Sequence, residues 1–358
     1  MTDFTIKQTG NKVEVHGGDL AITYEVFGMD LPEMADVSFA IWHLVPQAMV
    51  SRSSIHIKGV VDPLVIRNAK RLSRIWEMWA PTRFREVKIS ADEMLSPSRQ
   101  ARGRDIVFFS GGVDSTFYLL NRGQRPRGGH VLTIHGMDYK FEDSDRFSEL
   151  IDKTTPLLRN LNYKRVIIRT NAASYSQGAR LTHGFTLSGC AFLLGDLFDE
   201  AILAADYTWE QDMVSFPWGT NHVTNRHLSG TDFKIETGSM EWTRTEKVEA
   251  IAKNHIACDS ISFCVNYDMR PHNCGKCSKC IRTKAMFIAS TGSVPAIFKD
   301  ASLVEADLQG IDLPDRNEYA HFADLFLHAR ARGNLHKLPG LEKAMTEFRE
   351  KIAPTAPG

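Results

Sequence analysis

The stretch DIVFFSGGVDSTFYLL, residues 105–120, contains an apolar run, two glycines flanked by hydroxyl groups, and a second apolar run. The first run is short and unbroken, as expected of a strand that is buried in a parallel sheet. The second run has the spacing of a helix. Gly111 and Gly112 let backbone amides approach a ligand closely, and the start of a helix adds unpaired N–H groups. The stretch therefore predicts a strand, an anion-binding loop and a helix.

Similar apolar runs follow at residues 131–136, 164–170 and 201–207, and helical patterns separate them. Alternation of strands and helices is typical of an α/β fold, here an open parallel sheet with helices on both faces. Ligands in such sheets bind beyond the carboxyl ends of the strands. Asp206 and Asp212 lie at the carboxyl end of the strand expected over 201–207, so both are candidates for contact with a substrate.

Residues 1–98 show a different pattern and are expected to form a small N-terminal α+β domain. A Gly17-Gly18 turn between two strand-like runs indicates a hairpin. A helix is expected over 62–80, with Asp62 as its cap and Pro63 in its first position. No phosphate-binding signature occurs here, so we expect this segment to be dispensable for ligand binding by the 110–116 loop.

The remaining boundaries come from composition and pattern. SPSRQARGR, residues 96–104, has the composition of a linker. Residues 99–300 would hold the binding loop, and residues 301–358 a helical C-terminal region with a disordered tail.

The overall charge is balanced, with 43 basic and 43 acidic residues among 358. Nucleic-acid binders usually carry a basic excess, so a nucleic-acid partner is disfavoured. The most apolar stretch, residues 36–50, is interrupted by His43, Pro46 and Gln47, which argues against a membrane span. No export signal is recognised, and these features together predict a cytoplasmic protein with no membrane association.

Four cysteines, Cys264, Cys274, Cys277 and Cys280, occur in C-x9-C-x2-C-x2-C spacing. Four thiolates in one short segment are typical of a closed, structural zinc site. An iron–sulfur cluster remains an alternative, but no C-x3-C-P continuation follows the run. A zinc deaminase is excluded, because no His-x-Glu accompanies the cysteine pair.

SGGVDS, residues 110–115, closely matches the SGGxDS motif of the PP-loop ATP pyrophosphatases. Together with the later segment CVNYDMRPHNCGKCSKCIR, it resembles the 7-cyano-7-deazaguanine synthases over about residues 105–290. The resemblance implies a HUP-like fold, of the adenine nucleotide alpha-hydrolase type. It further implies that the loop grips the β,γ-pyrophosphate of ATP while a carboxylate is adenylated and a nucleophile then displaces AMP.

The resemblance also implies the roles of individual residues. Asp114 would place Mg²⁺, and Arg244 stands where the family has a lysine, so these two are the expected catalytic residues. The expected ATP-binding residues are Ser110, Gly111, Gly112, Val113, Asp114, Ser115, Thr116, His135 and Arg180.

The sequence thus predicts an ATP-dependent carbon–nitrogen ligase that forms AMP and pyrophosphate, with ATP, Mg²⁺ and Zn²⁺ as cofactors. Its substrate would be a carboxylate, such as a 7-deazaguanine of queuosine biosynthesis, and its second substrate ammonia or an amine. A homodimer is possible. The stretch at 208–233 does not match the substrate segment of the synthases. Two alternatives stay open: a tRNA-thiolating PP-loop enzyme, and a nucleotide-binding partner protein without turnover.

Overall fold

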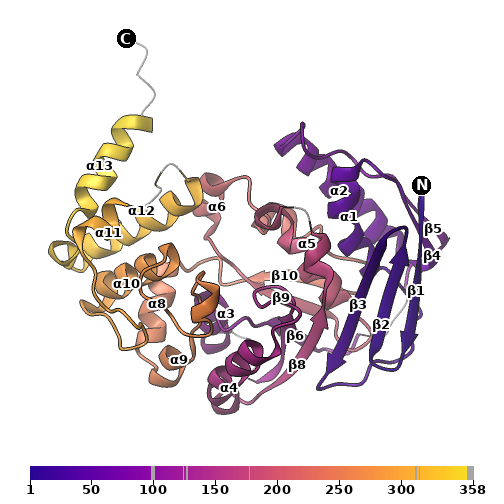
Figure 1. Cartoon of the computed structure of the whole chain (residues 1–358), viewed down its shortest axis with the longest axis horizontal. Coiled ribbons are helices and arrows are strands. Elements are labelled where there is room, and N and C mark those ends of the chain that lie inside the picture. Colours follow the sequence, from indigo (N-terminus) through magenta and orange to yellow (C-terminus); the bar gives the residue numbers. More distant parts are fainter. Residues whose placement is uncertain are drawn as a thin grey trace, which may run out of the picture.

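A computed structural model describes residues 1–97, 101–123, 125, 128–176, 178–310, 313 and 315–352. Ten strands in this part of the chain form a single sheet, in the order β10-β9-β6-β7-β8-β3-β2-β1-β4-β5 (Figure 1). The strands are β1 (Thr2–Thr9), β2 (Lys12–Gly17), β3 (Leu20–Phe27), β4 (Ile55–Val61), β5 (Ile89–Met94), β6 (Asp105–Phe108), β7 (Gly129–His135), β8 (Tyr163–Thr170), β9 (Glu200–Ala204) and β10 (Lys234–Gly238).

The half of the sheet formed by β6 to β10 is parallel throughout. The four strands expected after residue 105 are present, and β10 is an additional strand that the sequence did not predict. The expected α/β class with a large, mostly parallel sheet is confirmed. Because β7 and β9 flank β6 on opposite sides, the loop after β6 lies where ligands of such sheets bind.

The front segment continues the same sheet. The strand β2 is antiparallel to both of its neighbours, β1 and β3, and β3 pairs with β8 in antiparallel fashion. One hydrophobic core runs through both segments, because Trp42 and Trp76 belong to the same cluster as Ile106 and Phe185. The division at residue 98 stays a prediction, and residues 98–100 of the expected linker lie outside the described residues.

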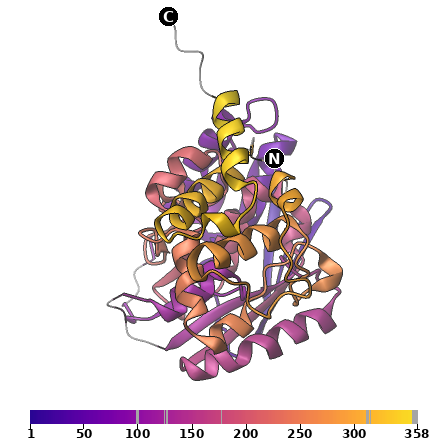
Figure 2. The same cartoon turned by 90° about the vertical axis from the view of Figure 1, so that its left-hand side faces the viewer.

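Helices cover both faces of the sheet. They are α1 (Phe39–Ser51), α2 (Pro63–Trp79), α3 (Val113–Leu120), α4 (Ser144–Asn160), α5 (Ala179–Phe192), α6 (Trp209–Ser215), α7 (His222–Asn225), α8 (Arg244–Ala252), α9 (His255–Ser260), α10 (Ser278–Thr291), α11 (Glu305–Gln309), α12 (Arg316–Ala331) and α13 (Leu341–Ile352). Short 3₁₀ turns occur at Ala172–Tyr175, Tyr267–Met269 and Leu335–Lys337. On β6, Ile106 belongs to the core under α1, α2 and α5, while its neighbour Val107 belongs to the core under α3, α8 and α10. The helices of the C-terminal half stack in front of the sheet in Figure 2.

Two helices of the front segment can be compared with what the local sequence pattern predicts. The helix α2 begins as expected, with Pro63 at its start and the Asp62 side chain accepting a hydrogen bond from the Leu64 N–H. The apolar stretch that contains His43 and Pro46 forms the buried helix α1.

Among the described helices, none combines the length and the apolar character needed to cross a membrane. The C-terminal region is helical as expected, and the predicted disorder of residues 353–358 lies outside the described residues.

Candidate active site

The loop between β6 and α3 adopts a backbone conformation that requires glycine. Gly111 has a φ of +76°, and a Cβ atom there would lie 3.0 Å from Cγ2 of Thr154. Gly112 caps α3 without a side-chain hydrogen bond to the helix. The first N–H groups of α3 are therefore left for a ligand, as at any uncapped helix start. The Ser262 N–H donates to the Gly111 carbonyl at 2.8 Å and fixes the loop from the other side.

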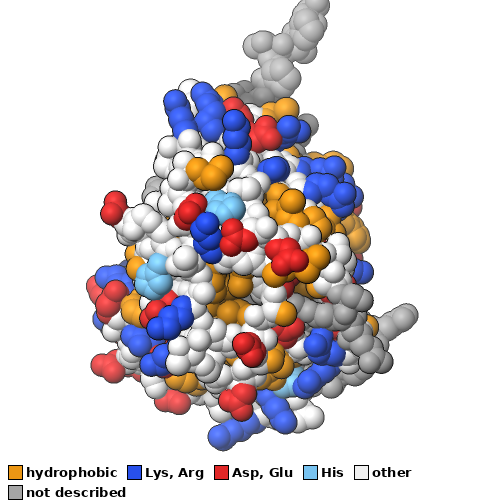
Figure 3. Space-filling view, turned by 90° about the vertical axis from the view of Figure 1, so that its right-hand side faces the viewer, with side chains coloured by type: hydrophobic (Ala, Val, Ile, Leu, Met, Phe, Trp, Pro, Cys, Tyr) orange, Lys and Arg blue, Asp and Glu red, His pale blue; other side chains and the backbone are white. Residues whose placement is uncertain are grey.

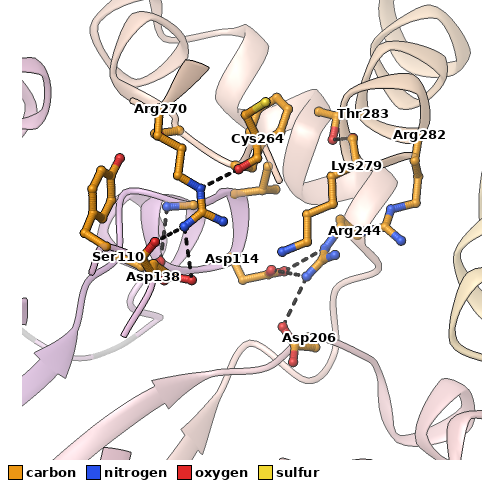
Figure 4. A pocket seen from close by; sticks show the side chains of 15 residues that line it. Ser110, Asp114, Asp138, Asp206, Arg244, Cys264, Arg270, Lys279, Arg282 and Thr283 are labelled. Carbon is orange, nitrogen blue, oxygen red and sulfur yellow. Dashed lines mark hydrogen bonds and ion pairs between the residues drawn. The ribbon is translucent and has the colours of Figure 1, made fainter. Parts of the chain in front are cut away.

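Two adjoining hollows open beside this loop. The narrow hollow has a volume of about 160 Å³ and the larger one about 400 Å³. Both are lined by Ser110, Gly112, Asp114, Asp138, Tyr139, Asp206 and Lys279. The narrow hollow also receives the cations Arg244, Arg270 and Arg282 (Figure 4). The larger hollow instead adds apolar side chains, among them Leu132, Ile134, Met137 and Trp218.

Arg244 links two acidic side chains of the site, Asp114 and Asp206. Its guanidinium is ion-paired with Asp114, and its Nη2 lies 3.1 Å from Oδ1 of Asp206. Burial opposes the charge of Arg244, but the two carboxylates outweigh it and raise the pKa of this guanidinium. Burial alone would raise the pKa of Asp206, yet the Arg244 charge leads the contacts that hold it below its usual value. The three side chains therefore form a charged network at the carboxyl end of the sheet.

Lys247 completes this network and was missed by the sequence interpretation. The side chain of Lys247 is fully buried. Its ammonium donates to the Ala205 carbonyl at 2.6 Å and to Oδ1 of Asp114 at 3.2 Å. Burial lowers its pKa against the opposing effect of Asp114. The signal was its spacing of three residues from Arg244, which places both on one face of α8.

The four cysteines come together as expected. Their sulfur atoms all lie within 4.8 Å of one another, and the pairs Cys264–Cys277 and Cys274–Cys280 are each separated by 3.8 Å. A tetrahedral ion with metal–sulfur bonds of about 2.3 Å places its ligands about 3.8 Å apart. The N–H groups of Lys276 and Cys277 donate to the Cys274 sulfur, each at 3.3 Å. The group could hold a metal such as zinc.

This cysteine centre is joined to the hollows by covalent and hydrogen bonds. Cys277 caps α10, the helix that carries Lys279 and Arg282 into the site. The Cys264 carbonyl accepts a hydrogen bond from Nε of Arg270 at 2.7 Å. Arg270, Lys279 and Arg282 all lie within the cysteine-rich segment but were not singled out from the sequence. A metal held by the cysteines would therefore also position the cations of the narrow hollow.

Most residues of the 110–116 loop line the hollows, but three expected ATP-binding residues, Gly111, Thr116 and His135, do not. His135 is buried, stacks on Phe147 at 4.2 Å, and contacts the Lys140 carbonyl through Nε2 at 2.9 Å. Thr116 is fully buried, and within the described part of the chain its hydroxyl has no hydrogen-bond partner. Neither is among the residues that line the two hollows.

Arg180 and Asp212 have different surroundings. Arg180 lines the larger hollow, and its largely exposed side chain is ion-paired with Asp315 of the segment before α12 at 2.9 Å. Asp212 is buried away from both hollows and accepts hydrogen bonds from the His222 N–H and Nδ1, each at 2.9 Å. Of the two aspartates proposed for substrate contact, only Asp206 therefore lines the site.

Comparison with models of known protein families, with curated proteins and with solved structures gave no match in any of the three searches.

Proposed function

We propose that this chain is an ATP-dependent ligase that adenylates a carboxylate, releases pyrophosphate, and transfers ammonia or an amine with release of AMP. The observation that carries the proposal is the loop at residues 110–114. There, an uncapped helix start faces a hollow with four cationic side chains, and that hollow continues into an apolar one. We further propose that the fold is of the HUP-like type seen in PP-loop enzymes, as the SGGVDS resemblance implies.

The narrow hollow suits a pyrophosphate group. Arg244, Arg270 and Arg282 line it beside the loop that the resemblance assigns to the β- and γ-phosphates. Charge develops on pyrophosphate as it departs, and fixed cations and backbone amides stabilise such charge without reorganisation. The larger hollow would then take the nucleoside and the carboxylate substrate against its apolar lining.

A magnesium ion fits the acidic side chains of the site. Mg²⁺ prefers oxygen ligands, and the carboxylates of Asp114, Asp138 and Asp206 line one hollow. Asp114 and Asp206 are the residues that would hold it, and the bound ion would neutralise charge on the phosphates. Zinc would be held by the cysteine centre, where four protein ligands leave no open position for chemistry.

The finer substrate assignment, a carboxylate on a 7-deazaguanine, rests on the family resemblance. Trp218 and the aliphatic side chains of the larger hollow suit a planar, weakly polar ring system. The alternative of tRNA thiolation is disfavoured by the two cysteines outside the centre. Cys190 and Cys258 are buried, and burial raises the pKa of both thiols, to about 11 for Cys258. Neither has the lowered pKa of a reactive sulfur carrier.

The test is a product analysis. Purified protein is incubated with ATP, Mg²⁺, ammonium and 7-carboxy-7-deazaguanine, and the products are identified by liquid chromatography with mass spectrometry. AMP, pyrophosphate and a modified deazaguanine are expected. ADP as the product would refute the cleavage assigned to the loop. Formation of AMP with a different carboxylate would support the reaction class but change the substrate assignment. Nucleotide binding without turnover would favour the partner-protein alternative.

A further inference from the structure

Lys279 occupies the place where the narrow and the larger hollow meet, because it lines both. It extends from the first turn of α10, and Figure 4 shows its side chain pointing into the hollow. Cys277 and Cys280, two members of the cysteine centre, flank it in sequence. A metal bound by those sulfurs would fix the backbone on both sides of Lys279.

The cations of the narrow hollow differ in how far the protein already compensates their charge. Three of them are bonded to protein acceptors: Arg244 to Asp114 and Asp206, Arg270 to the carbonyls of Cys264 and Asp138, and Arg282 to Glu318. The Lys279 carbonyl accepts a hydrogen bond from the Thr283 hydroxyl at 2.7 Å, but its ammonium group makes no hydrogen bond or ion pair with any described residue. Lys279 is thus the lining cation whose charge is left for a ligand.

We propose that Lys279 is a catalytic residue that binds the ligand where the hollows meet, contacting both the α-phosphate of ATP and the carboxylate that attacks it. This inference rests on the proposed function. In the step concerned, a carboxylate oxygen forms a bond to the α-phosphorus. The bond from that phosphorus to the bridging oxygen breaks, and its electron pair leaves with pyrophosphate. No proton or redox equivalent is exchanged.

The step needs a cation at this junction because two anions approach each other. A carboxylate and an α-phosphate repel one another, and the repulsion is greatest as the new bond forms. An ammonium group between them reduces that repulsion and stabilises the charge of the transition state. Arg244 is close by, but its guanidinium already binds carboxylates at Asp114 and Asp206. Lys279, on a flexible four-carbon stem, can reach either anion.

Lys279→Met tests the proposal, since it keeps most of the side-chain length and removes the charge. Lys276→Met is the matched control: Lys276 lies in the same cysteine segment, but its side chain is 78% exposed and pairs with Asp300 at 3.5 Å. Binding of ATP, AMP and inorganic pyrophosphate is measured by calorimetry on full-length protein of verified zinc content. Lys279→Met should bind ATP and AMP about 10-fold more weakly, as for the loss of one charged hydrogen bond. Pyrophosphate binding should change less than about two-fold, and Lys276→Met should match the unmodified protein.

The outcomes separate this inference from the proposed function. Failure of the unmodified protein to bind ATP would refute both. Normal ATP and AMP binding by Lys279→Met would overturn the role of Lys279 alone, as would an equal loss in Lys276→Met. An equal loss of pyrophosphate affinity would place Lys279 in the pyrophosphate site and also overturn the assignment. If Lys279→Met loses zinc, Lys279→Arg provides the test, because it retains the positive charge. Retained AMP affinity in Lys279→Arg would support the proposal, and lost AMP affinity would contradict it.

Discussion

Two strand-to-helix connections, one in each half of the sheet, differ in whether a protein side chain accepts hydrogen bonds from the N–H groups at the start of the helix. After β4, Asp62 follows the strand directly and caps α2, accepting a hydrogen bond from the Leu64 N–H at 2.8 Å. The same carboxylate also accepts from the Thr231 N–H at 2.6 Å and from its hydroxyl at 2.9 Å. After β6, Gly112 caps α3 with no side-chain hydrogen bond. One helix start is filled by the protein's own carboxylate, and the other is left open.

The difference shows why only one half of the sheet carries a candidate site. An internal carboxylate satisfies the N–H groups and the positive dipole of α2, so an external anion gains little there. At α3 the same groups face the hollows, and the surrounding cations add to the attraction for a phosphate. A site of this kind therefore depends on the absence of a local cap as much as on the presence of glycines.

The test with the largest expected effect removes residues 1–100, the segment in which Asp62 caps α2. A chain that begins at residue 101 lacks β1 to β5 and exposes the β8 edge that β3 covers. It also opens the core that Trp42 and Trp76 share with Phe185. We expect loss of cooperative folding, measured by circular dichroism and size-exclusion chromatography. A soluble, folded truncation that binds ATP would instead establish the two halves as independent domains, as the sequence suggested.

The next largest effect concerns the cysteine centre, which lies in the same half of the chain as the open helix start. Cys277→Ala removes one of four sulfur ligands, and structural zinc sites contribute about 10 kcal/mol or more to folding. We expect loss of zinc and a much lower unfolding temperature, measured by elemental analysis and calorimetry. Cys190→Ala is the control, because Cys190 is buried in α5 outside the centre and its loss should cost about 1 kcal/mol. Iron with sulfide in the purified protein would contradict the zinc assignment.

Paired substitutions at the two helix starts sharpen the comparison itself. Asp62→Asn keeps a good cap and should cost about 1 kcal/mol of stability while leaving AMP formation unchanged. Asp114→Asn removes the charge that faces Arg244 and Lys247 and would hold Mg²⁺, so AMP formation should fall at least about 100-fold. Unfolding temperatures and AMP release are measured for both variants. Near-normal turnover in Asp114→Asn would reduce Asp114 to a structural role.

The smallest expected effect comes from two glycines with a left-handed backbone, one in each half. Gly111→Ala adds strain at φ +76° and a contact of 3.0 Å with Thr154 beside the phosphate loop. Gly18→Ala adds similar strain at φ +58° in the hairpin turn, where the nearest atom is 3.6 Å away. Each change should cost about 1–2 kcal/mol of stability. Only Gly111→Ala should also weaken ATP binding, by about 10-fold, and equal ATP affinity in the two variants would count against the loop as the binding element.

The local sequence pattern predicts many of the individual strands and helices, but it does not predict how the two halves of the sheet join. The parallel strands around Ile106 and the cap at Asp62 are encoded within a few residues, and both predictions are confirmed. The strand β10 was missed because KIETG has only one large apolar side chain, Ile235, and lies within a largely polar stretch. The joining of the two halves depends on pairs such as Val26 with Ile168, which are far apart in sequence and leave no local signal.

The site was predictable to a similar degree. The loop and the cysteine spacing are compact motifs, so Asp114 and Cys277 could be named from sequence. Lys247 and Lys279 sit in charged runs, where sequence alone does not tell which side chain of a helix turns inward. His135 lies near the end of the expected strand 131–136, but its ring stacks on Phe147 and does not line the hollows.

The pairing of β3 with β8 has a consequence for how the chain emerges from a ribosome. The edge of β3, which ends at Phe27, stays bare until β8, which begins at Tyr163, has been synthesised. At translation rates of about 5–20 residues per second, that interval lasts on the order of 10–30 s. An uncovered strand edge recruits other strands, including those of neighbouring nascent chains. Slower synthesis should therefore lengthen the time during which this edge is open to such pairing.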